Sequence, residues 1–324
     1  MTYRHLRVLG ILVGCTSCLI LGSIPAAAQF MSHNFRGDFG VLAGTQPPPG
    51  WYVAGGYVRF DTDTLRDNDG NEITFDPLNR GDVAANGYAV GFWRVTEKKI
   101  LGGNYSFMAF PAFTDNKFQA PILGLYGSTS VGLTDLYFQP INLGWHTKQS
   151  DYTAGIGMVA PTGSFDPEAD DNLGLGMWSF ELFGGGTWYF DEAKKWHFAT
   201  VAFYETHSKK EDTDIRVGDI LTLEGGLGRS FMEGAITVGL AYDAQFKITE
   251  DDVGDLQPVF DLFNIGKHQV YSFGAEATLP LATKKKLYGF ITARYMWDTG
   301  ARNTFEGQTF VLLASFPVPS VALQ

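Results

Sequence analysis

Six charged residues recur on the polar side of segments in which polar and apolar residues alternate. They are Glu181, Glu224, Asp243, Lys247, Glu276 and Arg294. Alternation puts successive side chains on opposite faces of a strand, so these six would share one interior face. Glu224, Asp243 and Arg294 lie at comparable distances from the nearest short turn, which predicts a charged constriction that selects against bulk ions and orients a polar end of a solute. The alternative is that these charges pair only to satisfy one another.

The segment from Ala235 to Ile248 positions two of these residues and shows the alternation most clearly. Its apolar positions run without error from Ile236 to Ile248, and the intervening positions carry Thr, Gly, Asp, Gln and Lys. A typical strand in a soluble sheet has about 5–6 residues, whereas a tilted strand that crosses a bilayer needs about 9–11. The segment therefore predicts a transmembrane strand, which must belong to a closed barrel because lipid leaves no partner for a free sheet edge.

The rest of the chain repeats this pattern and predicts an all-β fold, a transmembrane antiparallel up-and-down β-barrel of about 12 strands. Short turns rich in lysine, such as 97–99 and 284–286, alternate strictly with long loops rich in acids. An even strand number places both termini in the periplasm, with the short turns. The stretch 114–134 leaves open a count of 14.

The N-terminus predicts export. Arg4 and Arg7 precede an apolar run from Val8 to Ile24, and Ala26–Ala28 supplies the small residues of a cleavage site after Ala28. A membrane-spanning helix and a lipoprotein cleavage at Cys15 are the weaker alternatives. The predicted division is a signal peptide at 1–28, a periplasmic lead or small plug at 29–49, the barrel at 50–317 and a tail at 318–324.

Composition argues against several other classes of protein. Both cysteines, Cys15 and Cys18, fall within the predicted signal peptide, and the six histidines show no His-x-x-x-His spacing. We therefore expect no cofactor and no metal site. Because no His-x-Ser pair appears on any predicted strand, we also expect no enzyme activity. The acidic loop at 67–72 lacks the first ligand of a helical calcium hand, because Leu65 stands at that position. A net charge of −11 argues against nucleic acid as a partner.

Two of the predicted outer loops are unusually apolar. They include Leu123 in one loop and Phe260 and Phe263 in the other. Exposed apolar loops favour aggregation, so we expect these residues to fold inward and contact a hydrophobic solute. The alternative is that they extend the barrel wall above the membrane.

An ordered series of loose motifs resembles a known family. The motifs are Gly132–Asp135, Asn142–Trp145, Pro161–Gly163, Asp212–Asp214 with Gly218–Asp219, Leu223–Gly228 and Gly274–Glu276. Together they resemble the outer-membrane family named for the meta-pathway of phenol degradation. One departure is that Phe316 is followed by residues 317–324, whereas many outer-membrane barrels end on an aromatic residue.

The resemblance implies a channel for passive uptake of small hydrophobic or aromatic molecules across the outer membrane of a Gram-negative bacterium. Lipid and lipopolysaccharide are the expected partners, and the oligomeric state is left open. The alternative function is a non-conducting structural or surface-interaction barrel.

Overall fold

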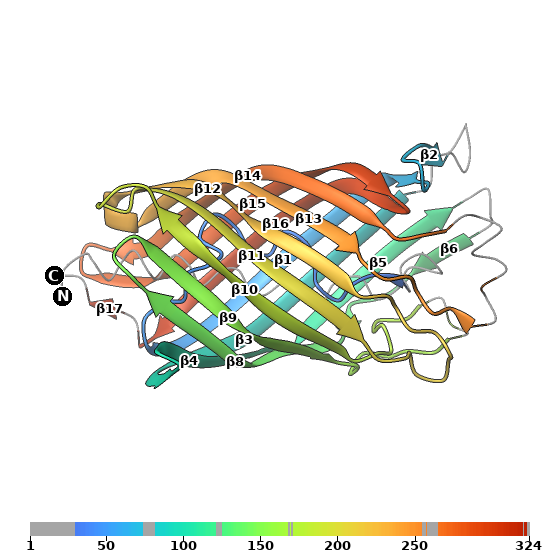
Figure 1. The fold of residues 1–324 in the computed structure, drawn as a ribbon, viewed down its shortest axis with the longest axis horizontal. Coiled ribbons are helices and arrows are strands. Elements are labelled where there is room, and N and C mark those ends of the chain that lie inside the picture. The colour runs from blue at the N-terminus through green and yellow to red at the C-terminus, as the bar shows by residue number, and fades with distance from the viewer. Residues whose placement is uncertain are drawn as a thin grey trace.

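The computed structural model describes residues 30–73, 82–120, 125–167, 169, 171–254, 257, 265–319 and 321–322. In this part the chain forms one closed antiparallel β-barrel of 12 strands, as predicted (Figure 1). Closure is made by β1 (Gly50–Arg66) and β16 (Thr304–Val318), which pair from Trp51 opposite Val318 to Arg66 opposite Thr304. None of the helices in the described residues is long and apolar enough to span a membrane.

The remaining strands follow chain order around the barrel, and some wall strands are made of several pieces. The pieces are β2 (Glu72–Ile73), β3 (Asp82–Ile100), β4 (Gly103–Phe110), β5 (Ala112–Ala120), β6 (Leu125–Ser128), β7 (Gly132–Leu133), β8 (Leu136–His146), β9 (Ser150–Ala160), β10 (Ser179–Tyr189), β11 (Trp196–His207), β12 (Ile220–Phe231), β13 (Ile236–Lys247), β14 (Gln269–Thr283), β15 (Lys286–Arg302) and β17 (Val321–Ala322). Pro111 separates β4 from β5, since proline cannot donate to the ladder. The short turns lie at the end of Figure 1 where β17 lies, and the long loops lie at the end where β2 and β6 lie.

Strand β13 has the two unlike faces that its sequence predicts. Asp243, Gln245 and Lys247 are buried on the inward face, whereas Leu240 on the outward face is 67% exposed. Outward aromatic residues cluster toward both ends of neighbouring strands: Trp178 stacks on Phe180 at the loop end, and Trp188 stacks on Phe198 at the turn end. Because apolar residues face outward and polar residues inward on β13, this strand has the polarity expected in a membrane barrel.

The structure corrects one prediction about the connections between strands and decides between the two predicted strand numbers. Strict alternation of short and long connections is wrong at the last hairpin, because β15 and β16 are separated only by Asn303, whose φ of 49° makes a tight left-handed turn. The stretch 114–134 adds no further strand pair to the barrel. Its described part extends the β3–β5 pairing outward and pairs with β6 and β7, so the count stays at 12.

Candidate functional site: the barrel interior

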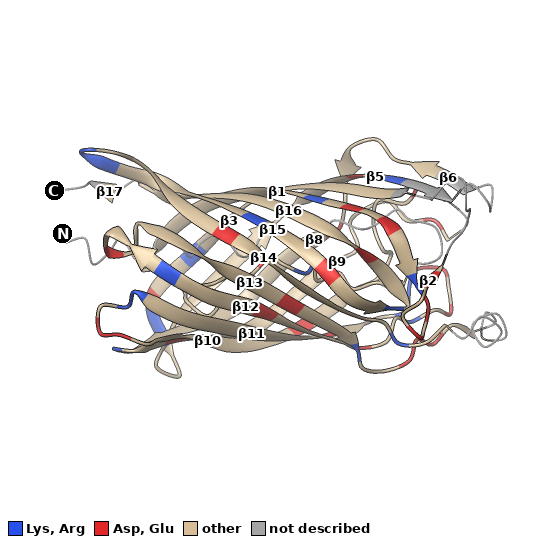
Figure 2. Cartoon of the chain, turned by 90° about the horizontal axis from the view of Figure 1, so that it is seen from above, with Lys and Arg blue, Asp and Glu red and all other residues tan. Residues whose placement is uncertain are grey.

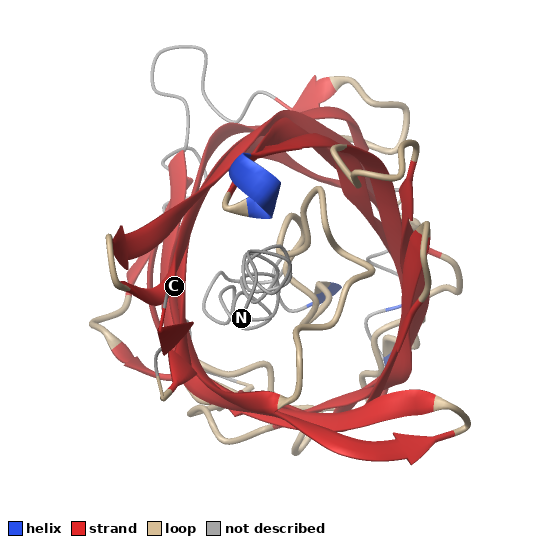
Figure 3. Cartoon of the chain, turned by 90° about the vertical axis from the view of Figure 1, so that its left-hand side faces the viewer, coloured by secondary structure: helices blue, strands red, loops and turns tan. Residues whose placement is uncertain are grey.

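Residues 30–49, the N-terminal segment, lie inside the barrel. The Lys247 ammonium at the loop end donates to the Phe30 carbonyl over 2.9 Å, and Gln46 donates to Ser106 Oγ over 2.9 Å close to the turn end. Figure 3 looks along the barrel and shows a loop within the ring of strands. The segment therefore runs along the interior before β1 begins. The sequence left a periplasmic lead and a small plug open as alternatives for residues 29–49, because residues 29–46 lack periodicity.

The segment passes very close to the wall at two wall glycines, Gly186 and Gly239. A Cβ atom on Gly44 would lie 2.1 Å from the Gly186 carbonyl carbon, and one on Gly239 would lie 2.7 Å from the Val41 side chain. Atoms this close would clash, so only glycine fits at both positions. Packing of this kind leaves little free space along this part of the interior.

A charged wall faces the segment on strands β12 to β15. The Arg294 guanidinium lies 2.7 Å from Glu276 Oε2, and both residues are buried (Figure 2 shows charged bands on the strands). Arg294 also donates to the Gly37 carbonyl, while the Val41 amide donates to Glu276 over 3.3 Å. This ion pair is therefore bonded to the segment as well as to itself.

Glu224 and Asp243 lie directly opposite each other on β12 and β13. Glu224 accepts a hydrogen bond from the Phe39 amide over 2.8 Å, and the Arg36 guanidinium lies 3.7 Å from Asp243. Arg36 also forms two bonds of 3.1 Å to the buried Asp298 carboxylate. Bidentate bonding of this kind fixes orientation as well as distance. The segment thus supplies a cation to a group of acids.

The other two predicted interior residues belong to different clusters. Glu181 on β10 accepts hydrogen bonds from Tyr137 over 3.0 Å and from Asn34 over 3.2 Å. Lys247 pairs with Asp251 over 2.7 Å at the loop end. All six predicted interior residues are therefore buried inside the barrel, but they do not form one ring.

His33 of the segment contacts three residues outside the segment, and this set of contacts is here called the His33 anchor. Its two ring nitrogens lie 2.6 Å from Ser179 Oγ and 2.8 Å from Asp135 Oδ2, and its amide donates to Glu205 over 2.9 Å. Serine, histidine and aspartate in a row are the components of a nucleophilic triad. Ser179 is completely buried, however, so no substrate reaches its hydroxyl in this structure, and the arrangement serves to hold the segment.

The His33 anchor continues into the long loops. Asp135 also accepts from the Leu175 amide over 2.8 Å, and the Leu175 carbonyl accepts from the Lys210 ammonium over 2.7 Å. Burial lowers the pKa of Lys210 to about 8, because the loss of hydration destabilises the ammonium more than the neutral amine. The segment, the wall and the β9–β10 and β11–β12 loops are therefore joined by one chain of hydrogen bonds.

Two clusters of apolar side chains also face inward, so the interior is not lined by the expected polar residues alone. The first apolar patch contains Phe39, Tyr52, Ala54, Trp93, Val95, Met108, Phe110, Phe183, Val201, Phe203, Leu287 and Phe290. The second apolar patch contains Phe35, Val58, Phe60, Val83, Ala85, Phe305, Val311 and Leu313. Each patch includes one phenylalanine of the segment, and the rings of Phe39 and Phe203 lie 4.9 Å apart.

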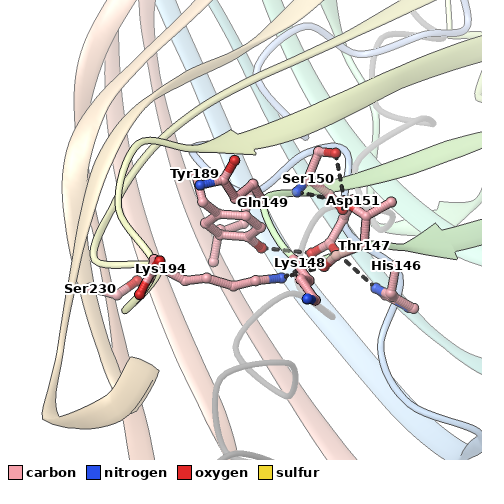
Figure 4. A pocket seen from close by; sticks show the side chains of 11 residues that line it. His146, Thr147, Lys148, Gln149, Ser150, Asp151, Tyr189, Lys194 and Ser230 are labelled. Carbon is pink, nitrogen blue, oxygen red and sulfur yellow. Dashed lines mark hydrogen bonds and ion pairs between the residues drawn. The ribbon is translucent and has the colours of Figure 1, made fainter.

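A cavity of about 1190 Å³ remains at the turn end (Figure 4). Leu42 of the segment contributes to its lining, together with the turns β8–β9 and β10–β11. Its buried acid, Asp151, accepts from Tyr189 over 2.6 Å and lies 3.0 Å from the His146 ring nitrogen. Lys194 lies 3.7 Å from Asp151 and 4.3 Å from the Tyr189 ring centre. The cavity therefore has a polar, internally bonded lining at the mouth of the barrel.

Several interior residues were missed by the sequence interpretation. Asp298 lies on the same strand face as Arg294, and Glu205 lies on the same face as the buried Phe203 and His207. Assigning every residue of these strands to a face would therefore have included both acids. His33 and Arg36 carry no such signal. Leu123, Phe260 and Phe263 lie outside the described residues. Within the described ranges, no three His, Cys, Asp or Glu side chains are grouped so as to hold a metal ion.

Comparison with solved structures supports the same architecture. The chain is similar to the COG4313 outer membrane channel from Pseudomonas putida F1, with a TM-score of 0.68 and 14% identity over 87% of this chain and 98% of that one. The β domain of the Bordetella autotransporter BrkA gives a TM-score of 0.45 and 13% identity over 83% and 99%. The likeness to the channel shows the fold alone, because the two chains share only 14% identity. No curated protein matches the chain.

The sequence also matches a family profile, and this confirms the predicted resemblance. The match spans residues 62–314, which is most of the barrel. The chain therefore belongs to the family named for the MetA-pathway of phenol degradation.

Proposed function

We propose that this protein is an outer-membrane channel for the passive uptake of small hydrophobic or aromatic molecules. The observation that carries the proposal is the pair of apolar patches on the inward face, each covered by one phenylalanine of the N-terminal segment. An apolar wall inside a membrane barrel has no use in conducting ions, but it can receive an apolar solute. Phe35 and Phe39 occupy the places that such a solute would take.

Displacement of the segment does not require opening of the barrel. Residues 30–46 bond to the wall through side chains and single amides, such as Phe39 N to Glu224, and form no strand ladder with it. A solute that covers the first apolar patch would recover roughly 25 cal/mol for each Å² of apolar surface that it buries. We propose that the conducting state is one in which this segment has moved away from the patches.

Two buried polar atoms indicate which solutes fit best. Within the described residues, Trp93 Nε1 and Ser315 Oγ have no hydrogen-bond partner. Trp93 belongs to the first apolar patch, and Ser315 pairs with Ala54 and Phe290 of that patch. An apolar site with a few polar groups orients its ligand through those groups. An aromatic molecule with one hydroxyl or carboxylate group would match this lining.

The charged wall is proposed to act as a constriction once the segment has moved. Glu224, Asp243 and the Arg294–Glu276 pair would then line the bore and reject bulk ions. Single-channel recording of Glu224→Gln and Arg294→Ala tests this, with Arg59→Ala on the outer face as the control. We expect altered ion selectivity in the two interior variants, and unchanged current and selectivity would refute the constriction.

A non-conducting barrel is the second candidate, and the tight packing of the segment against Gly186 favours it. The two candidates are separated by uptake of a radiolabelled phenol in a strain that lacks the protein. If the protein is a channel, initial uptake falls several-fold in that strain and is restored by the full chain. Equal uptake with and without the protein would establish the non-conducting alternative.

The same proposal includes location and partners. A barrel with apolar outward residues and exposed girdle aromatics such as Trp51 and Trp196 suits the outer membrane, reached by export and cleavage after Ala28. Outer-membrane lipid and lipopolysaccharide would then surround it, with the short turns and both termini in the periplasm. Membrane fractionation and N-terminal sequencing of the mature protein test these assignments.

A further inference from the structure

Two tryptophan–arginine pairs repeat the same geometry on the outward face of the barrel near the turn end. Trp51 of β1 lies directly opposite Arg94 of β3, and Trp196 of β11 lies directly opposite Arg229 of β12. The guanidinium carbon lies 5.2 Å from the Trp51 ring centre in the first pair and 5.0 Å from the Trp196 ring centre in the second. These distances are those of cation–π contacts.

The second pair is enclosed further by Phe231. Its ring centre lies 4.8 Å from the Arg229 guanidinium carbon, so this cation is contacted by two rings. Trp196 is 45% exposed and Phe231 is 39% exposed, which leaves the surroundings of the guanidinium open to the outside of the barrel. In the first pair, Trp51 is in turn contacted by Phe92, with the ring centres 5.9 Å apart.

An outward arginine nearer the loop end has a carboxylate partner. Arg59 of β1 makes two bonds of 2.6 Å to the Asp61 carboxylate beside it. Neither Arg94 nor Arg229 has an ion pair with any carboxylate in the part of the chain that the structure describes. The chain thus neutralises one outward arginine itself, whereas the two turn-end arginines contact aromatic rings and have no carboxylate partner among the described residues.

A bare guanidinium on a lipid-facing wall needs an anion from its surroundings. An arginine costs about 2–4 kcal/mol at the bilayer midplane and about 0–1 kcal/mol near the interface. Near the interface, the available anions are the phosphates of lipid headgroups, and the planar guanidinium binds phosphate in a bidentate way. Charge complementarity therefore selects a phospholipid as the occupant.

We infer that the Trp51–Arg94 and Trp196–Arg229 pairs are two phospholipid-binding sites, each taking one headgroup phosphate of the leaflet on the turn side. Each tryptophan packs against the upper acyl chain, while the arginine binds the phosphate. This inference rests on the proposed membrane location and is independent of transport, so either can fail without the other.

The test is native mass spectrometry of the full chain, released from detergent and titrated with phosphatidylglycerol. Arg94→Gln and Arg229→Gln are each expected to retain one phosphatidylglycerol fewer than the wild type, and the double variant two fewer. Arg59→Gln is the matched control and should retain the wild-type number. Arg94→Lys and Arg229→Lys keep the charge and are expected to retain the lipid with weaker affinity. Heat-dependent mobility on gels verifies that every variant is folded.

Three outcomes would overturn the inference. The first is an unchanged lipid count in the folded double variant. The second is a loss in Arg59→Gln equal to that in the other variants, which would show a general charge effect. The third is displacement of bound phosphatidylglycerol by millimolar inorganic phosphate, which would identify the sites as sites for free phosphate instead of lipid.

Discussion

The charged wall formed by β12 to β15 and a second, apolar wall formed mainly by β1, β3, β4, β10, β11 and β16 both contact the N-terminal segment, with side chains of opposite character. On the first wall, Arg294, Glu276 and Glu224 bond to backbone groups of residues 37–41. On the second wall, phenylalanines of the segment pack into apolar patches. Polar bonds depend on direction and set the register of the segment, whereas apolar contacts depend on area and can be replaced by another apolar group.

Under the proposed function, these two kinds of contact would let one segment be both well placed and displaceable. A channel closed only by ion pairs would open when charge or salt changed. In a channel closed only by apolar contacts, no directional bond would fix the position of the segment along the wall. Here the group that a hydrophobic solute would compete with is an apolar ring, while the charged wall stays paired within itself through Arg294 and Glu276. The following predictions test this division, beginning with the largest expected effect.

Arg294→Ala tests the charged wall. It leaves the Glu276 carboxylate buried without its cation, which typically costs about 3–5 kcal/mol of unfolding free energy. Urea unfolding in lipid vesicles, followed by tryptophan fluorescence, measures the loss. Arg59→Ala is the control, because its exposed pair with Asp61 contributes about 0–1 kcal/mol. Equal losses in the two variants would contradict the importance of burial.

Phe39→Ala tests the apolar wall. Removing a buried ring that contacts Phe203 is expected to weaken docking of the segment by about 3 kcal/mol. Hydrogen exchange of the amides of residues 37–43 measures this weakening, and exchange in the strand β11 should stay near the wild-type rate. Phe39→Leu keeps most of the apolar contact and should lie close to the wild type. Unchanged exchange in Phe39→Ala would mean that polar bonds alone hold the segment.

His33→Ala tests the His33 anchor at the loop end. It removes the bonds to Ser179 and Asp135 but leaves Asp135 with the Leu175 amide, so docking should weaken by about 2 kcal/mol. The same exchange experiment on residues 31–36 measures it. Faster exchange there, with residues 40–44 unaffected, would show that the two ends of the segment move separately. A uniform increase would show that the segment moves as one unit.

A pH change tests the loops that support this anchor. The pKa of Lys210 is about 8 in the folded protein, below the ordinary lysine value, so the unfolded loop binds more protons between pH 8 and about 10.5. Stability of the loops therefore rises with pH, by about 1 kcal/mol between pH 7 and 9. Exchange of the amides of residues 174–177, compared with Lys210→Met, measures this dependence. A fall in stability over this range would refute the assigned burial.

Alternation of side chains along single strands was enough to predict the barrel, its strand number and the inward position of all six charged residues. Each of these depends on a period of two, which is a local property of the chain. The error at the β15–β16 turn has a local cause as well. Asn303 is one residue in a left-handed conformation, and no composition change separates the two strands there.

The partners of the inward residues depended on the tertiary structure. The residues 30–46 have no periodicity, and only their position within the closed wall places Arg36 against Asp298 and His33 against Asp135, which are 262 and 102 residues away in sequence. The apolar patches also form only when the barrel closes, because residues such as Trp93 and Phe290 come from strands far apart in the chain. The sequence by itself determined which side of each strand faces inward, because that is set by neighbouring residues. Closure of the barrel and the path of the N-terminal segment decided what each inward side chain contacts, because those contacts join residues that are distant along the chain.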